Sequence, residues 1–318
     1  MIMKRFLWIT LVVIFMGLLT LPFWLNEERL VLKPAEISSG GKIAQTQSGF
    51  THYQLFGKEQ DPLVILIHGF SVPSYTWDNT VPYLVASGFR VLTFDLYGRG
   101  YSSRDHSRYD RGLFIRQLNE LLIELNINDK VSLVGLSMGA AIVGGYTSEF
   151  PHKVSKVVLL APFHQPIDIG PLKYPLLGDY IAYGFVVPSM ADSQSEDFVE
   201  PDNYPLWNEK YKSQMQYEGF RFALLATARD FLQTDPMADF RAIDQFSIES
   251  MLLWGAEDKV FDIKNQSLVS DALGKTNKSI TISNAGHALH FERANEVNPL
   301  IAEFLLSSDN QNETRSSL

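Results

Sequence analysis

A serine lies between two glycines in the segment 135–139, which reads Gly-Leu-Ser-Met-Gly. An apolar run over 131–134 precedes this segment and two alanines follow it, so the pattern predicts a tight turn from a strand into a helix. The small glycines clear the turn, and its strained backbone holds the serine hydroxyl exposed. We therefore expect Ser137 to be a nucleophile, with the backbone N–H of Met138 facing the oxyanion that forms during acyl transfer.

A second oxyanion donor is expected in the loop after another apolar run. The run 63–67 leads directly into His68, Gly69 and Phe70. Gly69 lets the chain turn back towards the nucleophile, and the backbone N–H of Phe70 then completes an oxyanion hole with Met138. A catalytic role for His68 is possible, but a histidine in this position is expected to brace the loop.

The general base is expected in the loop after the last predicted strand. The run 278–283 is strand-like and is followed by Gly286 and His287. Because glycine permits a sharp approach of the chain, we predict that His287 takes the serine proton. His290 is three residues further on and is expected to pack or to support the site.

These side chains need a frame, and the sequence predicts an α/β fold. Strands are expected over 50–56, 63–67, 90–94, 131–134, 157–160, 251–254 and 280–282, with helices over 73–86, 113–125, 137–150 and 295–306. Strands that alternate with helices are typical of a doubly wound, mostly parallel sheet. Ligands of such sheets bind beyond the carboxyl ends of the strands.

One stretch interrupts this alternation. Seven of the fifteen prolines lie between Pro162 and Pro205, among many aromatic residues. We predict an inserted helical cap over roughly 162–245, placed above the carboxyl edge of the sheet. An aromatic cap in that position would line a pocket, although it could also be a second structural layer.

Together these motifs resemble the α/β-hydrolase superfamily, in particular its lipase- and esterase-like members, such as monoacylglycerol lipases and carboxylesterases. The resemblance covers about 50–304. It rests on the segments 68–71 (His-Gly-Phe-Ser), 95–102, 135–139, 255–258 (Gly-Ala-Glu-Asp) and 286–287 (Gly-His). It implies a serine hydrolase fold with a Ser-Asp-His triad, and it says little about the substrate.

The acid of the triad is assigned through this resemblance. In the superfamily the acid follows the nucleophile in the chain and precedes the base. That order favours Asp258 over Glu257 and Asp262, and it leaves Asp95 to hold a glycine-rich loop. Asp258 would fix the tautomer of His287 and stabilise the imidazolium.

The first 33 residues differ from the rest of the chain. Lys4 and Arg5 precede an uncharged run over 6–25, and about twenty helical residues span the core of a bilayer. We predict that 1–33 is an uncleaved signal anchor, which makes the protein single-pass with its catalytic domain on the extracytoplasmic side.

Two other interpretations of this run remain open. A cleaved signal peptide, which would give a secreted protein, normally has a shorter apolar region and a small-residue cleavage site. A core helix of the soluble part would normally show a polar face. The hydrolase domain is expected over 34–306, and the polar tail 307–318 is expected to be disordered.

Composition excludes several kinds of partner. The 318 residues include 27 Lys and Arg against 36 Asp and Glu, a net charge of −9, which argues against nucleic-acid binding. The chain has no cysteine, so it has no disulfide and no thiolate nucleophile or metal ligand. No H-E-x-x-H pattern or phosphate-binding loop is present, so we expect no metal and no cofactor.

The sequence therefore predicts a serine hydrolase that cleaves carboxylic esters through an acyl-Ser137 intermediate. The expected partners are a small-molecule ester or lipid substrate, either a short- to medium-chain acyl ester or a monoacylglycerol, and a membrane bound through the N-terminal helix. The alternatives are a carbon–carbon bond hydrolase or a haloperoxidase-like perhydrolase of the same fold, and a non-catalytic binding protein.

Overall fold

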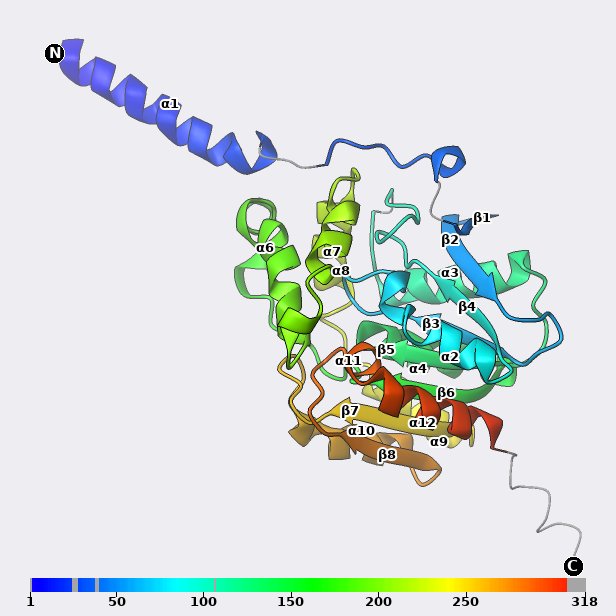
Figure 1. The fold of residues 1–318 in the computed structure, drawn as a ribbon. Coiled ribbons are helices and arrows are strands. Elements are labelled where there is room, and N and C mark those ends of the chain that lie inside the picture. The colour runs from blue at the N-terminus through cyan, green and yellow to red at the C-terminus, as the bar shows by residue number, and fades with distance from the viewer. Residues whose placement is uncertain (1, 25–27, 38–39, 106, 308–318) are drawn as a thin grey trace, which may run out of the picture.

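The computed structural model describes residues 2–24, 28–37, 40–105 and 107–307, and its centre is an eight-stranded sheet (Figure 1). The strands lie in the order β1-β2-β4-β3-β5-β6-β7-β8. Their bounds are β1 Lys42–Thr46, β2 Gly49–Phe56, β3 Leu63–Ile67, β4 Arg90–Phe94, β5 Val131–Leu136, β6 Val154–Leu160, β7 Glu249–Gly255 and β8 Asn277–Ile282. From β4 to β8 along this order all neighbours pair in parallel, whereas β1 and β2 form an antiparallel edge. The predicted α/β class with a mostly parallel sheet is confirmed.

Helices cover both faces of the sheet, which explains why its inner strands are apolar throughout (Figure 1). β3 reads Leu-Val-Ile-Leu-Ile, and its last four residues are buried. A strand covered on both faces has no solvent side, so it carries no alternating polar residues. One layer holds α3 Arg111–Glu124, α4 Met138–Glu149, α9 Met237–Gln245 and α10 Gln266–Leu273, and the other holds α2 Val81–Ala86 and α12 Ala294–Leu306.

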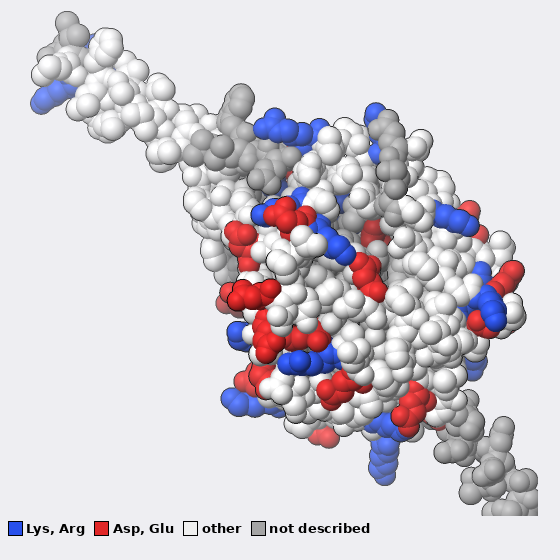
Figure 2. Space-filling model, in the orientation of Figure 1, with Lys and Arg blue, Asp and Glu red and all other residues white. Residues whose placement is uncertain are grey.

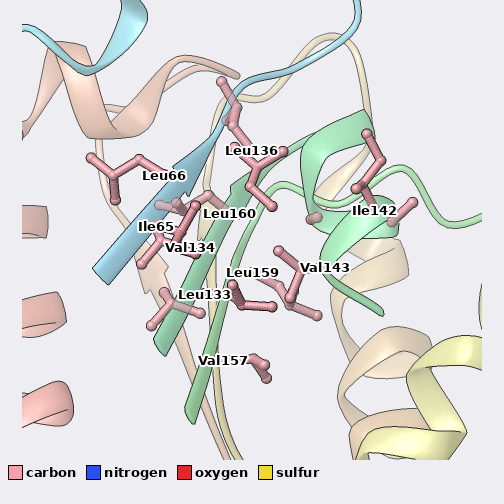
Figure 3. Packing of buried hydrophobic residues seen from close by; sticks show 14 of the residues in the cluster. Ile65, Leu66, Leu133, Val134, Leu136, Ile142, Val143, Val157, Leu159 and Leu160 are labelled. Atoms are coloured by element: carbon pink, nitrogen blue, oxygen red, sulfur yellow. The ribbon is translucent and has the colours of Figure 1, made fainter. Parts of the chain in front are cut away.

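The core lies where the central strands meet α4. Figure 3 shows buried side chains of β3, β5 and β6 close together, with Ile142 and Val143 of α4 beside them. Small residues bring α4 close to its neighbours. A Cβ atom at Gly144 would lie 2.9 Å from the ring of Phe240 on α9, so a larger residue there would push the two helices apart. This tight packing fixes α4, whose first turn begins at Ser137.

Two predicted elements differ from the structure. The helix expected over 73–86 is a 3-10 turn, Ser74–Trp77, followed by the short helix α2. Pro82 lies in the first turn of α2, where its missing N–H costs nothing, and in a longer helix that N–H would be needed. The hairpin strand β1 was not predicted, because its residues Lys-Ile-Ala-Gln-Thr form a mostly polar edge strand.

A group of short helices lies over the carboxyl ends of the strands. These are α5 Leu177–Ile181, a π-helical turn Ala182–Val186, α6 Val187–Ser193, α7 Trp207–Met215 and α8 Phe220–Asp230. They share a small core of their own, which includes Val187, Phe198, Trp207 and Tyr211. The range predicted for the cap also includes α9, which packs against α4 and α10 in the layer beside the sheet.

The N-terminal helix α1, Ile2–Trp24, projects away from the rest of the molecule (Figure 1). Its segment Met3–Thr20 has a mean hydropathy of 1.7 and none of it is buried. Figure 2 shows the helix as uncharged apart from the basic residues near its outer end. A helix of this kind can be a membrane anchor or a signal sequence. The end of the predicted run, residue 25, and the tail beyond 307 lie outside the described residues.

The last turns of α1 and the chain that follows it are fixed to the cap. The Tyr180 hydroxyl donates to the carbonyl of Leu18 over 3.2 Å, and the Arg221 guanidinium donates to the carbonyl of Pro22 over 3.0 Å. The carboxylate of Glu28 accepts the N–H of Arg221 over 2.6 Å, at the amino terminus of α8. The foot of α1 is therefore held against the helices that cover the sheet.

Candidate active site

Ser137 occupies a strained turn between β5 and α4. Its backbone angles are φ 55° and ψ −118°, a conformation that a residue with a side chain adopts only when its surroundings enforce it. Glycines on both sides permit the turn. A Cβ atom at Gly135 would lie 2.5 Å from the carbonyl oxygen of Gly139, and one at Gly139 would collide with the carbonyl of Ile67.

Hydrogen bonds from the next strand hold this conformation. The N–H of Ser137 donates to the carbonyl of Leu160 over 2.9 Å, and its own carbonyl accepts the N–H of Phe163 over 3.1 Å. The side chain is 8% exposed. The structure therefore places the Ser137 hydroxyl at the carboxyl edge of the sheet, at the start of a helix.

Asp258 and His287 form a buried pair at the same edge. His287 Nδ1 donates to Asp258 Oδ2 over 2.9 Å. The other carboxylate oxygen, Oδ1, accepts the N–H groups of Val260 and Phe261 over 2.8 and 2.9 Å. Both oxygens of the Asp258 carboxylate thus accept hydrogen bonds, and this fixes the orientation of the His287 ring. The other ring nitrogen, Nε2, is the one left to accept a proton.

The charge of the pair favours a basic imidazole. Burial alone would lower the pKa of His287, but the carboxylates of Asp258 and Asp197 outweigh burial and raise it above its ordinary value. A raised pKa makes His287 a better proton acceptor.

Ser137 and His287 line one cavity of about 120 Å³. Phe70 lines it too, and a Cβ atom at Gly69 would lie 3.4 Å from the Ser137 Cβ. Within the described part of the chain, no hydrogen bond joins Ser137 Oγ to His287, and neither Phe70 nor Met138 uses its N–H in a backbone hydrogen bond. Such contacts often tighten only when substrate binds. The sequence-predicted nucleophile, acid, base and one oxyanion donor are therefore close together, with Met138 adjacent to the nucleophile.

The family model described as the alpha/beta hydrolase fold matches residues 62–294. The chain belongs to the α/β-hydrolase family.

Relatives within this family differ in reaction. A putative non-heme chloroperoxidase of Synechocystis is 28% identical over 80% of this chain and 94% of its own. A monoacylglycerol lipase of Xenopus laevis is 22% identical over 77% of this chain and 76% of its own. The structure of a meta-cleavage product hydrolase from Pseudomonas fluorescens matches with a TM-score of 0.68 at 22% identity, over 83% of this chain and 97% of that one. The family is thus clear, and its members do not decide the substrate.

In this α/β-hydrolase His68 braces the loop, in keeping with the prediction. Its Nε2 accepts the N–H of Leu96 over 2.8 Å, and its Nδ1 donates to the carbonyl of Gly69 over 2.9 Å. Burial lowers the pKa of His68 to about 4. Both nitrogens are engaged by the backbone, so neither is left to exchange a proton with a substrate.

The Asp95 carboxylate holds a loop together and does not line the cavity that contains Ser137. Its carboxylate accepts from His52 Nδ1 over 2.8 Å, from the N–H and hydroxyl of Ser74, and from the N–H of Tyr101. Burial alone would raise the pKa of Asp95, but these hydrogen bonds and the nearby His52 and His68 lower it to about 2. This hydrogen bonding agrees with the loop-holding role that the sequence favoured for Asp95.

His290 is separate from the pair as well. Its Nε2 contacts the hydroxyl and the carbonyl of Thr76 over 2.9 and 3.0 Å, and its ring packs on Trp77. Burial lowers the pKa of His290 to about 3. It therefore supports the loop beneath the cavity, in line with the packing role expected for it.

The sequence predicted a cap that lines a pocket, but it identified neither the cap residues that do so nor the role of Glu292. The cap residues Gln194, Asp197 and Trp207 line the cavity with Ser137. The carboxylate of Glu292 accepts the N–H groups of Gly286, Val199 and Glu200, which ties the His287 loop to the cap. These residues carry no motif that the sequence analysis could use.

The described residues include no group of three or more His, Cys, Asp or Glu side chains that could hold a metal ion.

Proposed function

We propose that the protein is a serine ester hydrolase that acts on short acyl esters through an acyl-Ser137 intermediate. The observation that carries this proposal is the strained turn at Ser137 beside the buried Asp258–His287 pair, with one small cavity between them. Ester hydrolysis uses all three side chains and requires no further catalytic group.

The chemistry follows from these positions. His287 Nε2 takes the proton of Ser137 as its oxygen attacks the ester carbonyl carbon, and the N–H groups of Met138 and Phe70 stabilise the oxyanion. As the intermediate collapses, His287 gives the proton to the departing alcohol, and the acyl group stays on Ser137. Water then attacks the acyl group with His287 again as base, which releases the acid and restores Ser137. Asp258 orients the imidazole and stabilises its charged form throughout.

The cavity size supports the short end of the acyl range. The cavity that Ser137 lines measures about 120 Å³. Pockets for drug-sized ligands are several times larger, at about 300–1,000 Å³. A larger hollow of about 570 Å³ lies between α7 and the Asp95 loop, and neither Ser137 nor His287 lines it.

A rate series tests the proposal. We expect kcat/KM on p-nitrophenyl esters from C2 to C16 to be highest at C2–C4 and to fall with length, with a long-chain monoacylglycerol a poor substrate. Rates that rise with chain length would contradict the short-acyl proposal. No ester hydrolysis at any length, or on monoacylglycerol, would overturn the proposed reaction.

Perhydrolysis is the second candidate, because the Synechocystis relative is called a putative chloroperoxidase and a small cavity suits acetate and peroxide. Peracetate formation from acetate and hydrogen peroxide, at a rate that exceeds p-nitrophenyl acetate hydrolysis, would favour it. The small cavity favours a short ester over the large dienoate that carbon–carbon bond cleavage would require.

We also propose that α1 is an uncleaved anchor that leaves the hydrolase on the extracytoplasmic side of a membrane. The exposed apolar helix and the hydrogen bonds from the cap to the carbonyls of Leu18 and Pro22, both within that helix, support this. Edman sequencing of the mature protein tests it, together with protease accessibility of the hydrolase domain in sealed membrane vesicles of known orientation. A mature N-terminus near residue 26 would instead mean cleavage and secretion.

A further inference from the structure

We propose that Gln194, Asp197 and Trp207 form a polar subsite of the cap, which binds a hydroxyl group of the ester next to Ser137. The inference rests on the proposed ester hydrolysis and deepens it. It assigns the substrate to the class of short esters that carry a hydroxyl group near the scissile bond.

The three side chains come from one part of the cap. Gln194 and Asp197 bound a 3-10 turn after α6, and Trp207 is the first residue of α7. All three line the cavity that Ser137 and His287 line. A group bound to them is therefore within a few bonds of the reacting carbonyl.

Two of the three bury polar atoms that have no protein partner. Gln194 is 7% exposed, and its Nε2 donates to the carbonyl of Met190 over 3.0 Å, but its Oε1 accepts nothing from the described residues. Trp207 is 5% exposed, and its Nε1–H likewise donates to none of them. A buried polar group without a partner destabilises the fold, so such groups normally meet water or a ligand.

Asp197 is held in place by its backbone, and its carboxylate remains available. The carbonyl of Asp197 accepts the N–H of Ala288, next to His287, over 3.0 Å. A Cβ atom at Gly286 would lie 2.6 Å from that carbonyl, so the cap turn and the His287 loop fit tightly. In the described ranges no hydrogen bond or ion pair reaches the Asp197 carboxylate, and burial raises its pKa to about 6.

The chemistry of this set selects a hydroxyl group. Trp207 offers one donor, and Gln194 and Asp197 offer acceptors, so a ligand that both accepts and donates satisfies them. An alkyl group would leave all three unpaired, and a carboxylate would be repelled by Asp197 and Asp258. Sites built to hydrogen-bond a hydroxyl group reject analogues that lack it far more strongly than apolar pockets discriminate by size.

Matched ester pairs test the subsite on the full-length protein in detergent. One pair, ethyl 3-hydroxybutyrate and ethyl butyrate, places the hydroxyl group on the acyl side. The other, glycerol monobutyrate and propyl butyrate, places it on the alcohol side. We expect kcat/KM to be at least about 10-fold higher for the hydroxylated ester in one of the pairs. Equal values in both pairs would overturn the proposal while leaving ester hydrolysis intact.

Conservative variants show whether the preference comes from these residues. Trp207→Phe removes the N–H and keeps a ring to pack against Phe198 and Phe291, and Asp197→Asn keeps size and removes charge. Both should lower kcat/KM for the preferred ester about 10-fold more than for its partner. The exposed cap residue Asp202 provides the control, since Asp202→Asn should not change the ratio. An unchanged ratio in Trp207→Phe and Asp197→Asn would contradict the proposal.

A binding measurement separates failure of the subsite from failure of the proposed function. Saturation-transfer NMR on the Ser137→Ala protein compares 1,3-butanediol with 1-butanol. We expect binding of the diol to exceed that of the alcohol, and Trp207→Phe in this background to remove the difference. That result together with no esterase activity would refute the reaction and keep the subsite. Equal binding of the two probes would refute the subsite.

Discussion

Two buried aspartate–histidine pairs lie in this molecule, and they are alike at first sight. His52 Nδ1 lies 2.8 Å from Asp95 Oδ2, and His287 Nδ1 lies 2.9 Å from Asp258 Oδ2. Only His287 shares a cavity with Ser137. The Asp95 carboxylate also holds Ser74 and Tyr101, and so closes a loop. The two pairs therefore differ in their position relative to Ser137 rather than in their own geometry, and this position is the reason for proposing His287 as the base.

The topology of the sheet explains the difference. β4, which precedes Asp95, and β7, which precedes Asp258, each lie two strands from β5, on opposite sides. On the β7 side, the next strand β8 leads into a loop that returns His287 to the carboxyl edge. On the β4 side the partner histidine is inside β2, an antiparallel strand near the edge of the sheet. Only one of the two pairs therefore faces the turn at Ser137.

The largest expected contrast is between the effects of replacing His287 and of replacing His52. His287→Ala should lower kcat on p-nitrophenyl acetate by about 10³-fold or more, because the serine loses its base. His52→Gln should leave kcat within a few-fold and lower the melting temperature, because it weakens the loop. His290→Ala should likewise affect activity far less than His287→Ala. Steady-state kinetics and thermal unfolding of the three variants measure this, and the reverse ranking would place the base elsewhere.

The free energy of unfolding should depend on the Asp95 carboxylate. The pKa of Asp95 is about 2 in the folded protein against an ordinary 3.8, so its ionised form stabilises the fold by about 2 kcal/mol. This contribution is present above pH 4 and is lost as the pH falls towards 2. Asp95→Asn should therefore lower the free energy of unfolding by about 2 kcal/mol at pH 7, measured in urea. If Asp95→Asn lowered activity at pH 7 but left the free energy of unfolding unchanged, the structural role of Asp95 would be contradicted.

The pH dependence of activity should report the catalytic pair. Only neutral His287 accepts the serine proton, so kcat/KM should fall as the pH drops through its pKa. Because Asp258 and Asp197 raise that pKa, the midpoint of the acid limb should lie above pH 6.5. Asp197→Asn removes one of these charges and should move the midpoint to lower pH. A wild-type midpoint below 6.5, or an upward shift in the variant, would show that another group titrates.

A smaller effect is expected at the junction of α1 and the cap. Removing residues 1–27 or 1–33 should in either case release a soluble, active hydrolase, because the catalytic residues lie far beyond this region. The longer deletion also removes Glu28 from the amino terminus of α8, together with the backbone hydrogen bonds of Arg29 and Leu30 to the segment 216–218, a loss of at least roughly 1 kcal/mol. Its melting temperature should be about 2–4 °C lower than that of the shorter deletion.

Glu28→Gln in the full-length protein is the matched control for these deletions. It should lower the melting temperature by a similar amount while membrane association is retained. Equal melting temperatures for the two deletions would mean that the contact of Glu28 with α8 contributes nothing.

Much of this arrangement could be predicted from the sequence because its signals are local. β3 and β4 have the predicted bounds, since each is a continuous apolar run between turn residues. Asp258 and His287 each follow a strand, so their approach to the edge that holds Ser137 follows from the topology of parallel sheets.

What could not be predicted depends on contacts between distant segments. The pairing of His52 with Asp95 depends on the register of β2 against β4, which no motif marks. The place of Asp197 in the cavity depends on an irregular cap turn that is fixed by Ala288 and Glu292. The polar strand β1 depends on pairing at the edge of the sheet. The division of the helix predicted over 73–86 depends on Pro82.

Active-site labelling tests the central claim, that Ser137 is the nucleophile served by the Asp258–His287 pair, most directly. The protein is treated with a fluorophosphonate probe, and the labelled residue is located by peptide mass spectrometry in the wild type, Ser137→Ala and His287→Ala. The account predicts a single adduct on Ser137, none in Ser137→Ala although that variant remains folded, and slow labelling in His287→Ala. An adduct on another residue, or labelling that persists in Ser137→Ala, would contradict it.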